Sequence, residues 1–431
     1  MDELAPRADG PGVRRVALYS HDTQGLGHIR RNIAVAAALV AADPTTNVLL
    51  LTGAPEATAL PLPPRTEVLT LPTVAKDVDG AYASRVLDAP IADVLDLRCA
   101  VMTAALLSFR PDLLIVDKVA RGVGGELDHV LRVVRQALPT KVVLGLREIL
   151  DDPDMARDEW QRDGTDEALA TSYDAVWVYG DPTVFDPVQE YGFSPAVAAI
   201  TSHTGYLGRG QGTRTRTRSQ ARVVPPCSPY ALCMVGGGQD GFHLAHAFMQ
   251  ARGPDGVEQV AVSGPYMSAE HRRALREAAG ANPAARLLEF VPDAVEFISR
   301  AEAVVSMAGY NSVCEVLAAG RPALLVPRVR PRLEQLVRAE RLAHLGLADM
   351  LHPDGCTPAA VGRWLHATVG VERLPRRTPV DLDGLAVVPV LARRLVAGAA
   401  AVGALPVVSA LPTLLPHAGA AEPLEAARVA V

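Results

Sequence analysis

The first half of the chain alternates short, continuous apolar runs with helix-length segments that have one apolar face. The apolar runs lie at residues 16–20, 47–52, 67–71, 113–116, 141–146 and 175–179. Strands that are apolar on both faces and separated by helices are typical of a parallel sheet covered on both sides. The pattern predicts an α/β domain over residues 14–205, preceded by a disordered N-terminus over residues 1–13.

The same rhythm of strands and helices restarts in the second half, after a break in composition. Gly, Thr and Arg alternate without an apolar face over residues 208–218, which indicates a solvated linker, placed at 206–222. An RNA-binding arm is the alternative interpretation of this segment. We expect a second domain over residues 223–394 and an Ala-rich tail over 395–431. Its strands are expected at residues 230–235, 259–262, 287–291, 303–307 and 323–327.

Composition narrows the functional classes. The 431 residues carry 42 Lys and Arg against 48 Asp and Glu, a net charge of −6, which disfavours a general nucleic-acid binder. The five cysteines form no CxxC pair, so neither a disulfide framework nor a zinc site is expected.

A polar, acidic N-terminus without a signal peptide indicates the cytoplasm. Residues 395–416 carry no charge, but their prolines favour a flexible tail over a membrane span.

The stretch from Ser306 to Pro322 is the most informative for chemistry. A strand ends in a small-residue loop, Asn311 or Ser312 can cap the following helix, and Gly320 suits its C-terminal end. The helix N-terminus is then an anion site suited to a pyrophosphate. Glu315, expected in the first turn, can accept hydrogen bonds from a ribose diol. The alternative is an ordinary capped helix whose glutamate complements the dipole.

Two further segments belong with this stretch. Glu334 and Gln335 lie at the expected start of the helix after strand 323–327, where Gln can bind sugar hydroxyls. Arg328, Arg330 and Arg332 precede them and are interpreted as a solvated face. The glycine-rich segment 236–241 follows the first strand of the second domain, and its amides can stabilise developing negative charge.

Residues 304–340 resemble the donor-binding region of GT-B glycosyltransferases, most of all family 28. The matching positions are Gly309, Ser312, Glu315, Glu334 and Gln335, within a similarity that spans roughly 14–370. The resemblance implies two Rossmann-like domains facing across a cleft, with an inverting reaction. It implies a donor site made of Gly236, Gly237, Gly238, Gly309, Tyr310, Asn311, Ser312, Glu315, Glu334 and Gln335.

The N-terminal domain departs from the family pattern. Its loop from Gly25 to His28 is similar to the family's glycine-rich acceptor loop, but residues 116–127 look instead like a group of uncharacterised predicted glycosyltransferases. The N-terminal domain usually chooses the acceptor, so the acceptor stays open between a lipid-linked and a small molecule. The expected acceptor-side residues are Gly25, Gly27, Lys118, Arg121 and Arg147, with ordinary ion pairs between loops as the alternative.

His28 is the candidate base for the acceptor hydroxyl, because an imidazole titrates near neutrality and the glycine loop faces the cleft. His21 is the competing candidate, and His203 is expected to mark the hinge. No metal and no cofactor is expected beyond a nucleotide sugar, with a UDP-sugar favoured, as co-substrate. The predicted activity is sugar transfer by a cytoplasmic protein that contacts no nucleic acid and makes peripheral contact with the inner face of the membrane. A 2-epimerase of the same fold, a nucleotide-dependent oxidoreductase and a non-catalytic sugar-nucleotide sensor are the alternatives.

Overall fold

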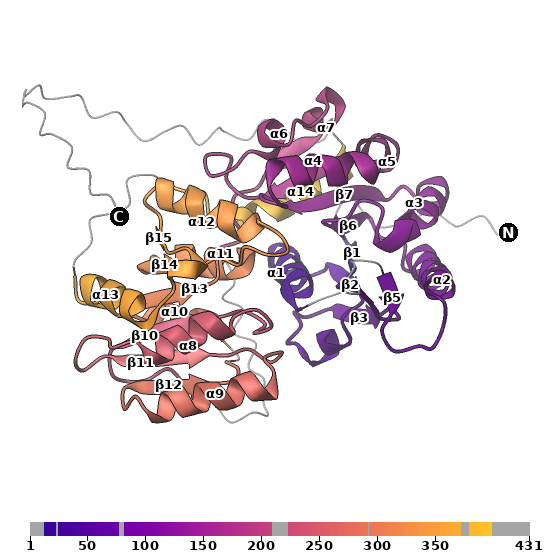
Figure 1. Ribbon diagram of the computed structural model, residues 1–431. Helices are drawn as coiled ribbons and strands as arrows, with labels where there is room; N and C mark the ends of the chain where they lie inside the picture. Colours follow the sequence, from indigo (N-terminus) through magenta and orange to yellow (C-terminus); the bar gives the residue numbers. More distant parts are fainter. Residues whose placement is uncertain are drawn as a thin grey trace, which may run out of the picture.

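The computed structural model describes residues 13–22, 25–76, 82–208, 223–291, 293–371 and 379–398. They form two domains, each built on a parallel sheet with helices on both faces (Figure 1). Most of the expected N-terminus, linker and tail therefore lies outside the described residues. Val13 at one end and Tyr206 and Leu207 at the other are buried in the core, so the domain is slightly longer than expected at both ends.

The first domain contains a seven-stranded sheet in the order β3-β2-β1-β6-β7-β8-β9. All six predicted strands are present, because their apolar residues are covered on both faces by the surrounding helices. The three-residue strand β9 extends the sheet through residues that the pattern did not predict as a strand. The strands are β1 (Arg15–Ser20), β2 (Asn47–Thr52), β3 (Thr66–Thr70), β6 (Leu113–Asp117), β7 (Lys141–Arg147), β8 (Ala175–Tyr179) and β9 (Thr201–His203).

Between β1 and β9, the described residues form seven α-helices that accompany this sheet and an antiparallel pair of short strands. The pair consists of β4 (Val74–Lys76) and β5 (Tyr82–Ser84). The helices are α1 (Gly27–Ala42), α2 (Ile91–Phe109), α3 (Glu126–Ala137), α4 (Pro153–Arg162), α5 (Thr165–Ser172), α6 (Pro187–Glu190) and α7 (Pro195–Ala199).

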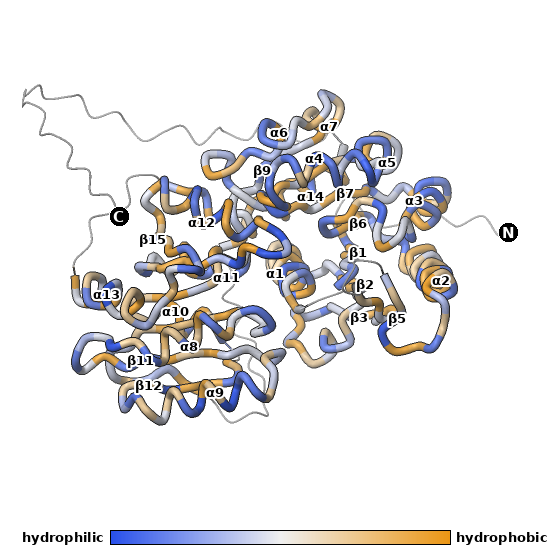
Figure 2. The backbone as a smooth tube through the Cα atoms, in the orientation of Figure 1, coloured by the Kyte–Doolittle hydropathy of each residue, from blue (hydrophilic) through white to orange (hydrophobic). Residues whose placement is uncertain are grey.

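The second domain has a six-stranded parallel sheet in the order β12-β11-β10-β13-β14-β15. Its strands are β10 (Tyr230–Met234), β11 (Glu258–Val262), β12 (Ala285–Leu288), β13 (Ala303–Ser306), β14 (Ala323–Leu325) and β15 (Asp349–Met350). Its helices are α8 (Phe242–Gln250), α9 (Ala269–Gly280), α10 (Ala294–Arg300), α11 (Tyr310–Ala319), α12 (Glu334–His344) and α13 (Pro358–Thr368). Polar and apolar residues alternate along α8 and α9, as expected of helices with one buried face (Figure 2).

The last described helix, α14 (Gly384–Ala397), packs on the first domain. Its residues Leu385, Val388 and Ala392 are buried in the same apolar cluster as Ile29 and Val35 of α1. The expected boundary at residue 394 had assigned this helix to the second domain and had started the tail inside it. Because the apolar face of α14 packs against apolar residues of α1, this helix belongs with the first domain.

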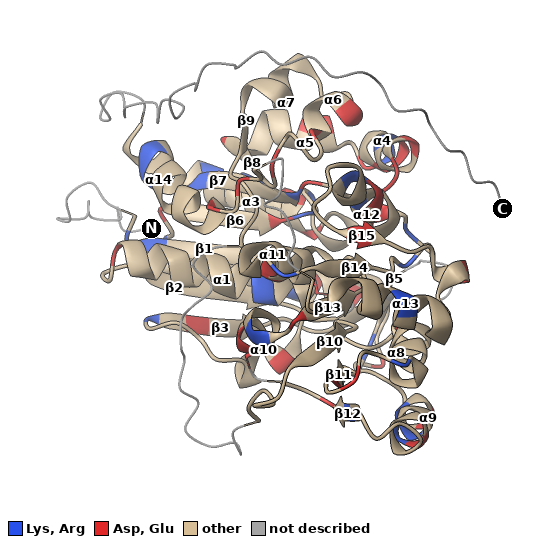
Figure 3. Ribbon diagram, turned by 90° about the vertical axis from the view of Figure 1, so that its left-hand side faces the viewer, with Lys and Arg blue, Asp and Glu red and all other residues tan. Residues whose placement is uncertain are grey.

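The two domains also share a core at their junction. Tyr310, Cys314 and Leu317 of α11 lie in one apolar cluster with Tyr206 and Leu207, which follow β9. Positions of Lys and Arg are interspersed with those of Asp and Glu along the ribbon of both domains in Figure 3. Within the described part of the chain, no helix is both long and apolar enough to cross a membrane.

Candidate active site

The reversals of strand order lie at the place where the two domains meet. In the first sheet the order reverses between β1 and β6, and in the second between β10 and β13. Open parallel sheets bind ligands at such switch points, outside the carboxyl ends of the strands. The glycine loops and the predicted donor helix follow these strands. Across the junction, the side-chain amide of Asn311 donates a hydrogen bond to the carbonyl of Gly27 at 3.1 Å.

His28 lies in the first turn of α1 and is held by Asp117, the last residue of β6. Its Nδ1 lies 2.5 Å from Asp117 Oδ2. Arg31, one turn further along α1, donates to both oxygens of the same carboxylate at 2.7 Å. Asp117 and Arg31 are buried, whereas 17% of the His28 side chain is exposed. An Nδ1–H that donates to Asp117 leaves Nε2 as the acceptor, and Nε2 has no hydrogen-bond partner among the described residues.

Burial lowers the pKa of His28, while the neighbouring charge of Asp117 opposes this shift. Burial alone would raise the pKa of Asp117, but the charges of Arg31 and His28 hold it well below the ordinary range. At neutral pH the pair is therefore a neutral imidazole beside a carboxylate, the state required of a general base. The competing candidate, His21, is buried 4.8 Å from the His28 ring, and burial sets its pKa well below 6.5.

The predicted donor loop follows β10 and turns tightly at two of its glycines. Gly236 and Gly238 have φ values of +61° and +92°. A β-carbon on Gly238 would lie 2.1 Å from the carbonyl oxygen of Ser263, so this position excludes any other residue. The carbonyl of Gly237 accepts a hydrogen bond from the amide of Tyr266 at 2.9 Å. The backbone therefore has the close, left-handed form typical of loops that approach a phosphate.

The structure revises the start of the donor helix. Gly309 is the N-terminal cap of α11 and no side chain caps it, so neither Asn311 nor Ser312 has the predicted capping role. Because the helix begins at Tyr310, Glu315 lies in its second turn, where it is buried and 3.6 Å from Arg30 of the first domain. Burial raises the pKa of Glu315. The C-terminal prediction is confirmed, with Gly320 in the left-handed conformation at φ +66°.

Tyr310 does not present its side chain to the site. Its ring lies in the junction core, 5.6 Å from the guanidinium of Arg31 and 5.8 Å from that of Arg338. Only its backbone N–H remains available to a ligand at the helix N-terminus. Ser312 lies in the first turn of the same helix and is half-buried.

Glu334 and Gln335 begin α12 as predicted, but both contact Arg328. The guanidinium of Arg328 donates to Glu334 Oε1 at 2.8 Å, and its backbone N–H donates to Gln335 Oε1 at 3.0 Å. The second carboxylate oxygen of Glu334 is buried and has no partner among the described residues. Arg328 also pairs with Asp240 beyond the glycine loop, so the loop and the start of α12 are connected.

The residues predicted for the acceptor side do not form one cluster. Gly25, with φ +70°, lines a cavity of about 180 Å³ between the domains, together with Asp22, Ala54, Glu56, Ala75, Arg85, Gln239 and Tyr266. Gly27 is the first residue of α1. Lys118 and Arg147 lie at the carboxyl ends of β6 and β7, as expected. Arg121 instead forms a surface ion pair with Asp128 of α3, which agrees with the alternative interpretation of this residue as part of an ordinary ion pair.

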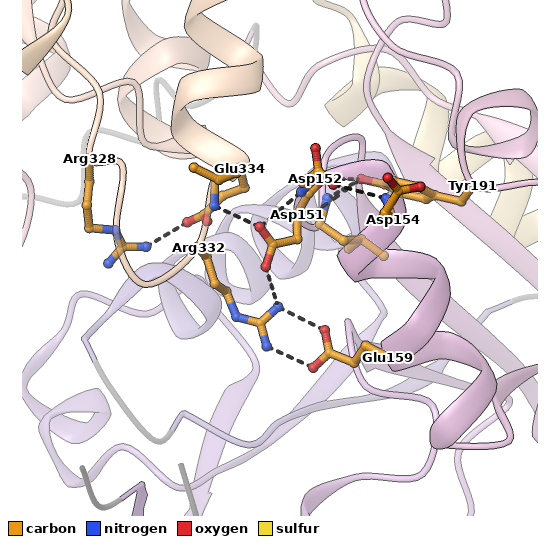
Figure 4. A network of polar contacts seen from close by, with 10 residues as sticks. Asp151, Asp152, Asp154, Glu159, Tyr191, Arg328, Arg332 and Glu334 are labelled. Carbon is orange, nitrogen blue, oxygen red and sulfur yellow. Dashed lines mark hydrogen bonds and ion pairs between the residues drawn. The ribbon is translucent and has the colours of Figure 1, made fainter. Parts of the chain in front are cut away.

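Sequence reasoning missed the ion pairs that join the domains. Arg332 binds Glu159 with two hydrogen bonds of 2.8 Å and also donates to Asp151 (Figure 4). Its interpretation as a solvated arginine is therefore wrong. The backbone N–H of Leu333 donates to Asp151 at 2.7 Å. These partners are far apart in sequence, and no local pattern connects them.

Asp117 and Arg31 were missed as well, although a signal was present. Asp117 is a charged residue at the end of an otherwise apolar strand, and Arg31 lies one helical turn from His28. The position of β6 next to β1 was required to connect them. Among the described residues, no group of three or more His, Cys, Asp or Glu side chains is arranged to hold a metal ion.

Comparison with solved structures identifies the class to which this arrangement belongs. Two parallel-sheet domains joined at their switch points form the GT-B fold. The calicheamicin glycosyltransferase CalG4 superposes with a TM-score of 0.54 at 16% identity, covering 89% of this chain and 96% of that one. MurG of Acinetobacter baumannii gives a TM-score of 0.51 at 18% identity, covering 88% and 94%.

The second domain can be assigned more closely. Residues 232–369, which lie within the second domain, match the Glycosyltransferase family 28 C-terminal domain. A related sequence is the UDP-N-acetylglucosamine--N-acetylmuramyl-(pentapeptide) pyrophosphoryl-undecaprenol N-acetylglucosamine transferase of Cronobacter sakazakii. It is 33% identical over 148 residues, which is 34% of this chain and 41% of that protein. The same enzyme of Salmonella arizonae is 31% identical over 144 residues, 33% and 40%. The chain thus spans about two fifths of the curated relatives that it matches.

Proposed function

We propose that this protein is a glycosyltransferase that moves a sugar from a nucleotide diphosphate sugar to an acceptor hydroxyl. One observation carries the proposal: the hydrogen-bonded pair of His28 and Asp117 lies at the switch point of one sheet, next to the predicted donor loop and helix at the switch point of the other. The hydrogen bond from Asn311 to Gly27 joins the two sides directly. This contact supports a base on one domain that acts beside an anion site on the other.

The chemistry follows from the positions of these groups. His28 Nε2 accepts the proton of the acceptor hydroxyl, whose oxygen then forms a bond to the anomeric carbon of the donor sugar. The bond from that carbon to the nucleoside diphosphate breaks, and the leaving diphosphate takes the electron pair. Amides of the glycine loop and of the α11 N-terminus stabilise the charge that develops on it. Attack from the face opposite the leaving group inverts the anomeric carbon, and these protein groups suffice without a metal.

A UDP-sugar is the favoured donor. Residues 232–369 match the family 28 C-terminal domain, and the curated relatives are named for their use of UDP-N-acetylglucosamine. Their named acceptor is linked to undecaprenol, which supports a lipid-linked acceptor and a place at the inner face of the membrane. A small-molecule acceptor remains the alternative. Flotation of the full chain with liposomes tests the membrane contact, and recovery in the lipid-free fraction would contradict it.

The test of the donor site is a thermal-shift panel of the full chain with UDP, GDP, dTDP, CDP and NAD. One nucleoside diphosphate is expected to raise the melting temperature by mass action. The corresponding nucleotide sugars are then assayed for release of the diphosphate, with water or added acceptors taking the sugar. A shift with NAD alone would favour an oxidoreductase and contradict the proposal.

The role of His28 is tested by His28→Asn, with the exposed His129→Asn on α3 as the matched control. The His28 variant is expected to bind the nucleotide as before but to lose about 100-fold or more in rate, the usual contribution of a general base. The control should retain full activity. Nucleotide binding without any sugar transfer or release in the unmodified protein would indicate a sensor instead. A donor returned with an inverted sugar carbon would indicate an epimerase.

A further inference from the structure

Two cationic side chains lie at the carboxyl edge of the first sheet, beside the His28–Asp117 pair. Lys118 follows β6 directly, and Arg147 is the last residue of the neighbouring strand β7. The backbone N–H of Lys118 donates to the carbonyl of Gly145 at 2.8 Å, which holds the two strand ends together. Lys118 also has φ +69°, a conformation that costs free energy for a residue with a β-carbon and that often occurs at functional sites.

Neither side chain has a counter-ion in the described part of the protein. The Nε of Arg147 is buried without a hydrogen-bond partner there. No carboxylate of the described residues lies within ion-pair distance of the Arg147 guanidinium or the Lys118 ammonium. Other buried arginines differ: Arg31, Arg98 and Arg338 each hold a carboxylate, Asp117, Glu126 and Glu148 respectively.

Two carboxylates whose charges act on Lys118, those of Glu159 and Glu334, already bind other arginines. Glu159 binds Arg332, and Glu334 binds Arg328 through one of its oxygens. Burial, with the added charges of Arg147 and Arg332, lowers the pKa of Lys118 to about 7. A guanidinium stays charged at neutral pH, so the buried, unpaired Nε of the half-buried Arg147 costs free energy of folding. An anionic ligand would remove that cost.

We propose that Lys118 and Arg147 bind an anionic group, a carboxylate or a phosphate, on the substrate that reacts beside His28. The planar fork of Arg147 suits two parallel hydrogen bonds to such a group, and Lys118 adds a point charge. The acceptor is the expected source, because both residues belong to the first domain. A charged donor sugar is the other source, because the charge of Glu334, a predicted donor-site residue of the second domain, acts on both cations. The inference rests on the proposed transferase function, which it extends to the class of substrate.

The first test is a titration of the full chain with inorganic phosphate at constant ionic strength, followed by thermal shift. Lys118→Met and Arg147→Met are compared with Lys141→Met, which lies at the opposite end of β7 and pairs with Asp174. The unmodified protein and the control are expected to share one affinity, while each site variant binds at least about ten-fold more weakly, the usual loss for a charged hydrogen bond. Equal affinities in all four proteins, or no shift at all, would overturn the proposal.

A second readout separates binding from a merely structural role. Without phosphate, Arg147→Met is expected to melt no lower than the unmodified protein, because it removes a half-buried charge whose Nε has no partner among the described residues. A lower melting temperature would mean that Arg147 stabilises the fold, and would count against a ligand role. Arg147→Lys, which keeps the charge but loses the fork, should bind phosphate with intermediate affinity.

The source of the anionic group is then determined with substrates. If the acceptor carries the anionic group, the acceptors are treated with phosphatase or esterified before the assay. This treatment should abolish turnover by the unmodified protein and have little effect on turnover by Arg147→Met. If the donor carries the anionic group, Arg147→Met should lose activity with a nucleotide-linked uronic acid and keep its activity with the corresponding uncharged nucleotide sugar. The nucleoside diphosphate shift must persist in both site variants. If the nucleoside diphosphate causes no thermal shift even in the unmodified protein, the proposed function is contradicted. The phosphate titration tests the anion site independently of that result.

Discussion

Loss of the ion pair between Arg338 and Glu148 provides the sharpest test of how the two domains are joined. Neither side chain is exposed, and Arg338 donates to the two oxygens of Glu148 at 2.6 and 3.3 Å. Tyr206 donates to the same carboxylate at 3.1 Å, and Arg338 also donates to the carbonyl of Ala308 at 3.1 Å. Arg338→Met would leave a buried carboxylate with a single donor, a change that typically costs about 3–5 kcal/mol.

The assay is urea unfolding of the full chain, followed by circular dichroism and tryptophan fluorescence. Arg341→Met is the matched control, one turn further along α12, where the arginine forms an exposed pair with Glu190. This surface pair is worth about 0–1 kcal/mol. In the double variant Arg338→Met/Glu148→Gln, the neutral amide still accepts from Tyr206, and about 1–3 kcal/mol should be recovered relative to the single variant.

The same substitution should weaken binding of the nucleoside diphosphate. Arg338 holds the carbonyl of Ala308, which has φ +60° and directly precedes Gly309, the N-terminal cap of the donor helix α11. Without that hydrogen bond the loop before α11 loses an anchor. The reasoning is refuted if Arg338→Met costs under about 1 kcal/mol, if it matches Arg341→Met, or if the double variant is no more stable than the single one.

Three further predictions concern the site itself. Gly238→Ala should lower stability and nucleotide affinity far more than Gly236→Ala, because only the former brings a β-carbon to 2.1 Å from a carbonyl oxygen; similar melting curves would contradict the backbone geometry. The rate of sugar transfer should rise with pH through a value below 6.5 and then level off, since burial lowers the pKa of His28 and only its neutral form accepts a proton. Asp117→Asn should move the rising part of this pH profile to lower pH and reduce the plateau rate. A rising part that does not move would exclude His28 as the base. Phosphate affinity should fall as pH rises above about 7, because burial lowers the pKa of Lys118, and a constant affinity from pH 6 to 9 would show that Arg147 alone binds.

Much of the site was predictable from local patterns. The glycine loop at 236–238, the helix that ends at Gly320 and the start of α12 at Glu334 each have a signature within a few residues. His28 was predictable because a loop between a strand and a helix lies at the carboxyl edge of a parallel sheet. The hydrogen-bond and ion-pair partners of these side chains could not be predicted from local patterns, since Asp117 is 89 residues from His28 and Glu148 is 190 residues from Arg338.

The sequence by itself determined the two α/β domains, because apolar runs that alternate with helices can be buried only in parallel sheets covered on both faces. It also predicted which segments of the chain contribute to the candidate site. Only the tertiary structure decided which charges are neutralised and which are not. It pairs Arg332 with Glu159, buries Tyr310 in the junction, returns α14 to the first domain and leaves Lys118 and Arg147 without a carboxylate among the described residues. Such pairings depend on the order of strands and on the meeting of two domains, which bring together residues that no periodicity along the chain connects.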